Sequence, residues 1–298
     1  MRDNHGYTRT DMAAECCADL DLEQGVRGIR FREYQRERIP VSRLEITDEE
    51  GEQILGKPRG CYITLDVGKI WLESDAAFET AVIVLGEELK ALVEAKVEKL
   101  DSVLVVGLGN RFITSDAVGP LTVKHLTVSR HMKEWEPQLF EALATLPIAA
   151  IAPGVVGQTG IETAWLIRGT AEAIAPSVIL CVDALAAKSV ERLAVTVQLS
   201  DNGIAPGSGI GNRRQAIDEA FLGIPVIAIG VPTVVDSSTM VYGMLEKAGV
   251  TELSPALKTE LDNGRSFFVT LKDADTATAE MARMVAQAIH HAFSVNPS

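Results

Sequence analysis

The sequence predicts an α/β fold in which helices cover both faces of a mostly parallel sheet. Three short, nearly continuous apolar runs rich in Val and Ile support this, and each ends in turn or polar residues: 102–110, 177–185 and 224–236. Strands that are apolar on both faces are typical of parallel sheets buried on both sides. Segments with helical spacing of apolar residues separate the runs, and no linker interrupts them, which indicates one α/β domain.

The other elements follow in order from a charged beginning. Residues 1–50 carry many charges and little apolar periodicity, so we expect an irregular or marginally ordered leader there. A strand within 60–71 and a helix over 75–100 come next, because apolar residues alternate in the first segment and recur at helical spacing in the second. The alternation in 194–201 predicts an edge or hairpin strand. Further helices are predicted at about 117–133, 161–175, 184–192, 212–222 and 275–293.

Composition and charge exclude several classes of protein. The chain has 298 residues, with 28 Lys and Arg against 41 Asp and Glu, so its net charge is −13. Such a charge repels nucleic-acid phosphates and anionic lipids, and we expect neither a nucleic-acid nor a membrane partner. No run approaches the ~20 apolar residues of a membrane span, and the N-terminus lacks the apolar stretch of a signal peptide. The four cysteines form no CxxC pair, which favours a reducing cytoplasm.

Two aspartates stand where the functional residues of a parallel sheet gather. In such sheets, these side chains lie outside the carboxyl ends of the strands. Asp116 follows the run 102–110 and precedes a predicted helix, while Asp183 lies at the end of the run 177–185. If the two strands are neighbours, we expect both carboxyl groups to point into one cleft.

A pair of carboxyl groups in one site has a defined chemistry. The two cannot both ionise cheaply, so they share a proton and titrate together. One member can then take a proton from water while the other donates to the carbonyl oxygen or the leaving group, which hydrolyses an amide without a covalent intermediate. Asp is also a preferred N-cap, and both residues precede predicted helices, so helix capping remains the alternative.

Other motifs carry weaker signals. The segment GLGN at 107–110 lacks the third glycine of a dinucleotide-binding loop, and the glycine-rich segment 206–214 lacks the Lys of a P-loop. The second segment offers Arg213 and Arg214 for holding an acidic substrate group. Cys181 is expected to be a buried structural residue. Four histidines lack the spacing of a zinc protease, so we expect no metal and no cofactor: His125, His131, His290 and His291.

Five segments carry a resemblance that extends from about Tyr7 to the last predicted helix. They are VVGLGNRFITSDAVGP, PGVVGQTGIET, VDALAAKSVERL, DNGIAPGSGIGNRR and LGIPVIAIGVPTVVDSSTM. In this order and spacing they resemble the germination protease family of spore-forming bacteria. Members of that family are endopeptidases that degrade small acid-soluble spore proteins.

The resemblance implies a type of enzyme, an oligomeric state and a course of maturation. It implies an atypical aspartic-type endopeptidase with an α/β fold similar to that of hydrogenase maturation proteases, whose two functional aspartates match Asp116 and Asp183. It also implies a homotetramer, made as an inactive zymogen in the cytoplasm of the developing spore and kept in the spore core. Such a zymogen removes its own N-terminal propeptide, and at germination the enzyme acts on small acid-soluble spore proteins.

The leader contains a segment that resembles the family's substrates. These are cut between an acidic and a bulky apolar residue, in a pattern like Thr-Glu-Phe/Ile-Ala-Ser-Glu. The string TDMAAE at 10–15 has the same order of side-chain types. We therefore expect self-cleavage between Asp11 and Met12, with residues 1–11 as the propeptide and 12–298 as a single α/β peptidase domain. A disordered acidic leader without processing is the alternative.

Two other functions remain open. One is a metal-dependent processing peptidase, because the related maturation proteases use acidic and histidine side chains around a metal, although no matching third ligand is evident here. The other is a binding protein on the same scaffold, in which Asp116 and Asp183 only cap helices. Lys188 joins the two arginines of segment 206–214 as a candidate for reading the acidic residue of a substrate.

Overall fold

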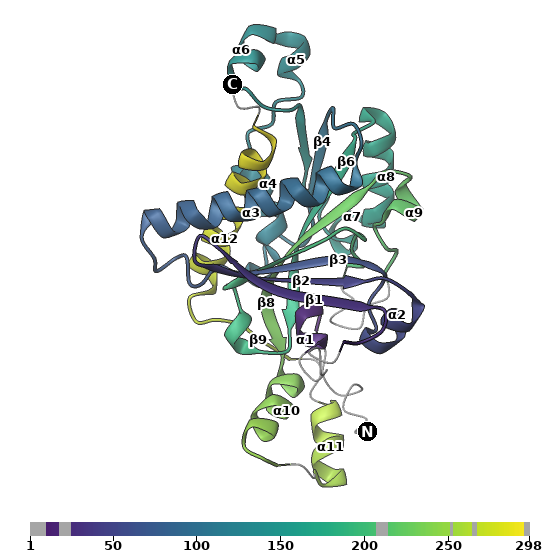
Figure 1. Cartoon of the computed structure of the whole chain (residues 1–298), viewed down its shortest axis with the longest axis vertical. Helices are drawn as coiled ribbons and strands as arrows, with labels where there is room; N and C mark the ends of the chain where they lie inside the picture. Colours follow the sequence, from purple (N-terminus) through teal and green to yellow (C-terminus); the bar gives the residue numbers. More distant parts are fainter. Residues whose placement is uncertain (1–9, 18–24, 207–213, 251–252, 264–266, 295–298) are drawn as a thin grey trace.

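A computed structural model describes residues 10–17, 25–206, 214–250, 253–263 and 267–294 of the chain. In this part of the chain, one mixed sheet of nine strands has the order β1-β2-β3-β7-β8-β6-β4-β5, with β9 paired to β8 (Figure 1). The strands are β1 (Ile29–Arg36), β2 (Ile39–Ile46), β3 (Gly60–Asp66), β4 (Val103–Gly107), β5 (Ile148–Ile151), β6 (Val178–Ala187), β7 (Thr196–Ser200), β8 (Val226–Asp236) and β9 (Phe268–Val269).

The sheet has a parallel and an antiparallel part. Strands β5, β4, β6 and β8 run parallel to one another. Strands β7, β3, β2 and β1 continue the sheet in antiparallel pairs. The predicted α/β class is confirmed, and the apolar runs correspond to the three central parallel strands.

Helices occupy both faces of the parallel part. They are α1 (Ala13–Cys16), α2 (Glu49–Leu55), α3 (Asp75–Lys96), α4 (Val118–His125), α5 (Met132–Trp135), α6 (Pro137–Ala142), α7 (Val156–Thr159), α8 (Thr163–Ile174), α9 (Glu219–Leu222), α10 (Ser237–Lys247), α11 (Pro255–Asn263) and α12 (Ala274–Phe293), with the 3-10 turns η2 (Thr114–Asp116) and η3 (Val190–Arg192). Apolar side chains of α3 and α12 join one face of β4, β6 and β8 in the largest buried cluster. Those of α8 cover the other face. No helix described here is both long and apolar enough to cross a membrane.

The prediction of an irregular leader over residues 1–50 was wrong for its second half. Strands β1 and β2 form a hairpin, and α2 follows it. Most of β1 is at least partly exposed, so its charged side chains hide the strand pattern. The hairpin turn is made by Glu37 and Arg38, with φ of 47° and 76°. Glycine or asparagine usually marks such a turn, and neither occurs here.

Four other element predictions need correction. The predicted helix 184–192 is wrong at its start, because β6 continues to Ala187 beside β8 and only η3 follows. The predicted edge strand is the internal strand β7, which pairs with β3 and β8. The predicted helix 117–133 ends at His125, and a separate helix α5 begins at Met132. Of the predicted helix 212–222, the structure has α9 only, and residues 212–213 lie outside the described part.

Unequal strand lengths create the space for a site. Strand β4 ends at Gly107, opposite Val182 of β6. Strands β6 and β8 continue together to Ala187 and Val235. Beyond Val182, no strand of the described residues pairs with the β6 edge that β4 covers up to that point. The turn η2 and the beginning of α4 lie beside this edge instead.

Candidate active site

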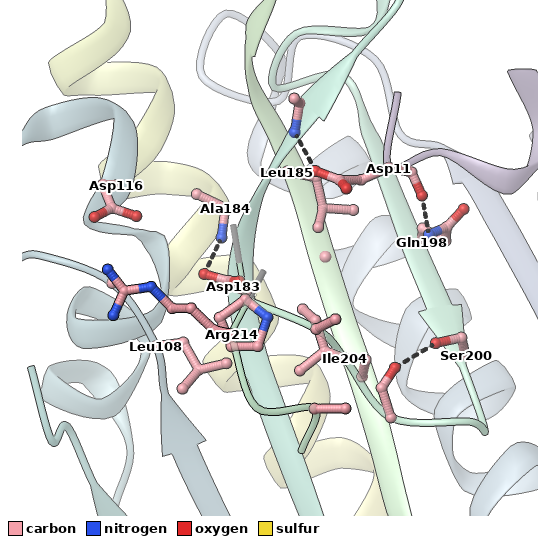
Figure 2. A pocket seen from close by; sticks show the side chains of 18 of the residues that line it. Asp11, Leu108, Asp116, Asp183, Ala184, Leu185, Gln198, Ser200, Ile204 and Arg214 are labelled. Atoms are coloured by element: carbon pink, nitrogen blue, oxygen red, sulfur yellow. Dashed lines mark hydrogen bonds between the residues drawn. The ribbon is translucent and has the colours of Figure 1, made fainter. Parts of the chain in front are cut away.

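The two predicted aspartates line the same cavity. Asp183 lies on β6, one residue past the end of β4, opposite Gly230 of β8. Asp116 lies in η2, between β4 and α4. Both line a cavity of about 610 Å³ that also reaches Asp11 of the N-terminal segment (Figure 2). The neighbouring strands therefore bring the pair together, although Asp183 is within its strand and not at the strand's end.

Two glycines permit the close approach of η2 and α4 to the sheet. Gly109 has φ +108°, and a Cβ atom there would lie 2.1 Å from the carbonyl oxygen of Asp116. A Cβ atom on Gly119 would lie 2.4 Å from the carbonyl oxygen of Val182. A side chain at either position would push the Asp116 segment away from β6. The GLGN segment thus has a packing role, which sequence reasoning did not assign to it.

Burial and mutual repulsion favour a protonated state of this pair. Asp183 is only 6% exposed, and burial, then the charge of Asp116, raise the pKa of its carboxyl group well above the usual value. Burial also raises the pKa of Asp116, while a hydrogen bond from the Asn110 amide (2.9 Å) and the charge of Arg214 act in the opposite direction. The Asp183 carboxylate accepts a hydrogen bond from the Ala184 amide at 2.9 Å. Asp183 is the member that holds a proton more firmly.

Neither aspartate caps a helix. The N-cap of α4 is Ala117, and the Asp116 carboxylate accepts from Asn110, which precedes η2. Asp183 lies within a strand. The capping interpretation is therefore wrong for both residues, and their carboxyl groups need another explanation.

The segment around Asp11 is bound along the cavity wall. The Asp11 amide donates to the carbonyl oxygen of Ala186 (2.8 Å), and the Asp11 carboxylate accepts from the Ala186 amide (2.9 Å). Two side chains donate to the carbonyl oxygen of Asp11: Lys57 Nζ at 3.2 Å and Gln198 Nε2 at 3.2 Å. Gln198 Oε1 also accepts from the Ala13 amide at 2.6 Å. The peptide bond between Asp11 and Met12 is thus held by contacts on both sides.

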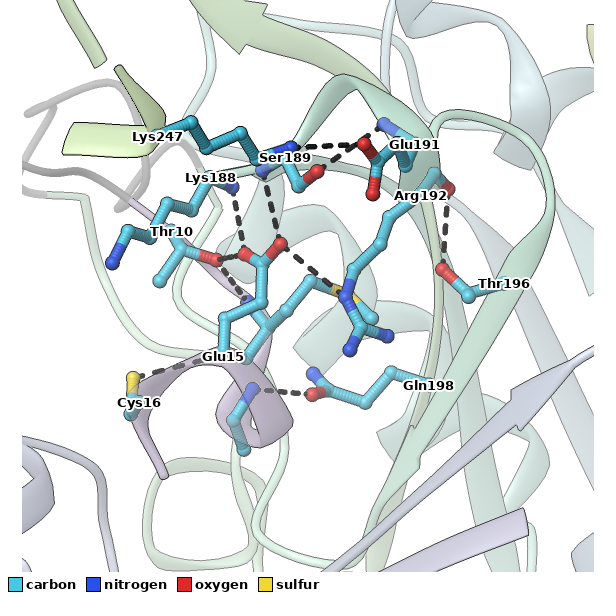
Figure 3. A network of polar contacts seen from close by, with 12 residues as sticks. Thr10, Glu15, Cys16, Lys188, Ser189, Glu191, Arg192, Thr196, Gln198 and Lys247 are labelled. Carbon is cyan, nitrogen blue, oxygen red and sulfur yellow. Dashed lines mark hydrogen bonds and ion pairs between the residues drawn. The ribbon is translucent and has the colours of Figure 1, made fainter. Parts of the chain in front are cut away.

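Met12 and Glu15, which follow Asp11 in the sequence, are also held by contacts with the rest of the chain. The side chain of Met12 is fully buried in an apolar cluster with Leu185, Ala187, Leu193 and Val235. Glu15, only 8% exposed, is bound by groups from the loop after β6 and from η3 (Figure 3). The two residues of the expected cut, Asp11 and Met12, therefore lie beside the cavity that contains the aspartate pair.

Sequence reasoning missed three polar residues near the N-terminal segment: Lys57, Gln198 and Arg192. Of these, Gln198 lies on the polar face of β7, with Thr196 and Ser200, so the strand pattern did not distinguish it. Of the predicted acid-binding candidates, Arg214 lines the cavity, and Lys188 donates its backbone amide to Glu15 at 2.7 Å. Arg213 lies outside the described residues.

The surroundings of Cys181 and His290 indicate structural roles for both residues. Cys181 is fully buried, and burial raises the pKa of its thiol. His290 Nε2 accepts a hydrogen bond from the Thr127 amide at 2.9 Å, and burial lowers the pKa of this histidine. Within the described ranges, no three side chains of the His, Cys, Asp and Glu types gather as a metal site would require.

Comparison with known proteins gives a consistent result. A family model described as germination protease matches residues 8–247. A germination protease of Caldanaerobacter subterraneus is 44% identical over 247 residues, which cover 83% of this chain and 74% of that protein. Germination proteases of Clostridium acetobutylicum and Clostridium tetani are 38% and 37% identical, and the matches cover 90% and 95% of this chain and 81% and 85% of theirs.

Proposed function

The chain belongs to the germination protease family and is a peptidase of spore germination, and on this basis we propose how it works and on what. It is an endopeptidase that begins the degradation of small acid-soluble spore proteins, with Asp116 and Asp183 as the pair that activates water. Its N-terminal segment is a propeptide, residues 1–11, which the zymogen removes by cutting between Asp11 and Met12. The rest, 12–298, is a single α/β peptidase domain.

One observation carries the proposal: Asp11 lines the same cavity as Asp116 and Asp183, and contacts on both sides hold the Asp11–Met12 peptide bond. The backbone of Asp11 pairs with Ala186 of β6. Its carbonyl oxygen accepts from Lys57 and Gln198. Met12 fills an apolar pocket on the other side of the bond. Each of these contacts is one that an enzyme needs in order to orient a peptide for attack.

The mechanism follows from the different surroundings of the two carboxyl groups. Asp116, the less buried one, is ionised and takes a proton from water as the water oxygen attacks the carbonyl carbon. Asp183, whose pKa is raised further, keeps its proton and donates it as negative charge develops on the carbonyl oxygen. Lys57 and Gln198 stabilise that developing charge as hydrogen-bond donors. When the intermediate collapses, Asp116 gives the proton that it took from water to the leaving nitrogen, and the C–N bond breaks. Asp183 takes its proton back from the new carboxyl group.

Replacing each aspartate by asparagine tests the catalytic assignment. Purified chain is incubated with a small acid-soluble spore protein in excess chelator, and the fragments are analysed by mass spectrometry. We expect Asp116→Asn and Asp183→Asn each to lower the rate of cleavage by about 10²–10⁴-fold. Asp101→Asn, at an exposed position paired with Lys99, serves as the matched control and should cut at the wild-type rate.

Two outcomes would contradict the proposal. Near-normal cleavage by both asparagine variants would remove the aspartates from the mechanism. Loss of wild-type cleavage in chelator, restored by a divalent metal ion, would favour the metal-dependent processing peptidase instead.

The proposal extends to assembly and location. We place the enzyme in the cytoplasm of the developing spore and in the spore core, where its substrates are, and we propose a homotetramer. Large apolar side chains on the surface support an assembly, among them Phe112 and Trp165, with 75% and 68% of their surface exposed. Sedimentation equilibrium should give four times the chain mass of 32.0 kDa, and a monomer would contradict this part of the proposal.

A further inference from the structure

Strand β8 contains an irregularity at Thr233, in the part of the strand that lines the cavity. Leu185 of β6 pairs with Pro232 of β8. The next residue of β6, Ala186, pairs with Val234, so Thr233 is the extra residue of a β-bulge. A bulge points a side chain in a direction that a regular strand would not give it, and bulges are frequent beside active sites.

The side chain of Thr233 is directed at the turn that carries Asp116. Its hydroxyl donates to the carbonyl oxygen of Ser115 at 2.6 Å. Ser115 is the middle residue of η2 and directly precedes Asp116. Only 4% of Thr233 is exposed, and the bond to Ser115 offsets the free-energy cost of burying its hydroxyl. The bulge in β8 is thus connected to the segment of Asp116 by a short, shielded hydrogen bond.

The backbone of the bulge is itself held from two sides. The carbonyl oxygen of Thr233 accepts from the Thr270 hydroxyl at 2.8 Å. The carbonyl oxygen of the preceding residue, Pro232, accepts from the Ala194 amide at 2.7 Å. These donors belong to the segments that follow β9 and η3, far from β8 in the sequence. The hydroxyl of Thr233 is therefore presented from a fixed backbone.

A second bond holds η2 on its other side. The Thr114 hydroxyl donates to the carboxylate of Asp275, near the start of α12, at 2.6 Å. This bond is exposed, so water competes for both of its partners, whereas the bond from Thr233 is shielded and electrostatically stronger. The sheet thus holds η2 more firmly than α12 does, and Asp183 belongs to the same sheet (Figure 2).

From these contacts we infer that Thr233 is a positioning residue: its hydroxyl fixes η2 so that Asp116 and Asp183 act on the same peptide bond. The inference rests on the proposed function, since it takes these two aspartates as the pair that activates water. Ala186, which accepts from the Asp11 amide, is paired beside the same bulge. One irregularity of β8 therefore adjoins both the aspartate pair and the bound peptide.

The rate of spore-protein cleavage by the full chain tests this role. Thr233→Val keeps the shape of the side chain and removes its donor. We expect kcat to decrease about 10- to 100-fold, with KM within about threefold of wild type, because a misplaced catalytic group slows the reaction without weakening substrate binding. Thr233→Ser keeps the hydroxyl and should have a kcat within about threefold of wild type.

Thr122→Val is the matched control. Thr122 is a fully buried residue of α4, and its hydroxyl also donates to a backbone carbonyl oxygen, that of Val118, at 2.9 Å. Both valine variants lose a buried hydrogen bond, and denaturant unfolding measures the stability of each. We expect Thr122→Val to keep the wild-type kcat, so a loss of stability alone does not account for the effect at Thr233.

A double replacement shows whether Thr233 acts through Asp116. Adding Thr233→Val to Asp116→Asn should lower the residual rate by less than about twofold, because a carboxylate that is absent cannot be misplaced. A further tenfold loss, or a normal kcat of Thr233→Val while Asp116→Asn is inactive, would overturn this inference and leave the proposed function standing. A wild-type rate of Asp116→Asn would overturn the proposed function, and this inference with it.

Discussion

The buried carboxyl group of Asp183 lowers the stability of the folded chain at neutral pH. The surrounding β6 and β8 backbone is buried, and so is the side chain, which raises its pKa. Between the pKa of an unfolded aspartate, about 3.9, and the raised value, the folded state binds more protons than the unfolded state. The free energy of unfolding therefore decreases as pH rises through this window. The buried carboxyl group therefore lowers stability at neutral pH.

Replacing this residue should stabilise the protein in a pH-dependent manner. Asp183→Asn keeps an oxygen that accepts from the Ala184 amide and removes the cost of the buried charge. We expect thermal denaturation at pH 7 to show a melting temperature a few degrees above wild type, with the gain shrinking toward zero near pH 4. A melting temperature lowered equally at both pH values would mean that the carboxyl group contributes to packing instead.

Lys57 is a second residue whose proposed role can be tested, because its side chain contacts the carbonyl oxygen of Asp11. Lys57 Nζ donates to it and also to the Thr10 carbonyl oxygen, at 3.2 and 3.1 Å. Lys57→Met keeps the aliphatic stem and removes the donor, so we expect kcat for spore-protein cleavage to decrease by about 10- to 1,000-fold with a smaller change in KM. Lys99→Met, at an exposed position, is the control. An unchanged kcat would leave Lys57 without a role in transition-state stabilisation.

At the scale of elements, the main discrepancy lies at the end of β6. The string ALAAKSVERL has helical spacing, and the sequence alone favours a helix over 184–192. Residues 184–187 are instead a strand, because they pair with β8 along their whole length. Tertiary pairing overrides local propensity here. The extension holds the N-terminal segment, since Asp11 is bound to that part of β6.

The connection from β4 to η2 depends on one glycine. Gly109→Ala would place a Cβ atom 2.1 Å from the Asp116 carbonyl oxygen at a φ of +108°. We expect it to lower the free energy of unfolding by about 1–3 kcal/mol and to reduce peptidase activity, because the Asp116 segment must move. Denaturant unfolding and cleavage assays measure both.

Gly157 provides the matched control for this substitution. It lies in α7, and a Cβ atom there would meet nothing within 4 Å. Gly157→Ala should be neutral or slightly stabilising, because alanine favours a helix more than glycine does. Equal effects of the two substitutions would show that the close approach at Gly109 does not position Asp116.

At the scale of the whole molecule, sequence reasoning was most successful where one rule decided the outcome. Apolar runs identified the parallel strands. The expectation that the strands near Asp116 and Asp183 are neighbours placed both residues in one cavity, although Asp183 is within its strand. The hairpin β1–β2 was missed because its turn, at Glu37 and Arg38, contains no glycine or asparagine. The contacts of Asp11 and Glu15 could not be found from spacing, since Lys57, Gln198 and Arg192 are far away in the sequence.

The N-terminal segment contacts several elements of the fold. Asp11 and Met12 contact β6, β7 and the loop before β3, so the segment lies along a wall of the cavity that contains Asp116 and Asp183. From these contacts we propose that the chain cuts its own Asp11–Met12 bond with Asp116 and Asp183.

The most direct test is the intact mass and N-terminal sequence of purified chain after incubation. We expect the wild-type chain to lose eleven residues and begin at Met12, while Asp116→Asn and Asp183→Asn remain uncut and Asp101→Asn is processed normally. A mature chain that begins at another residue, or asparagine variants that are processed at the wild-type rate, would contradict the account.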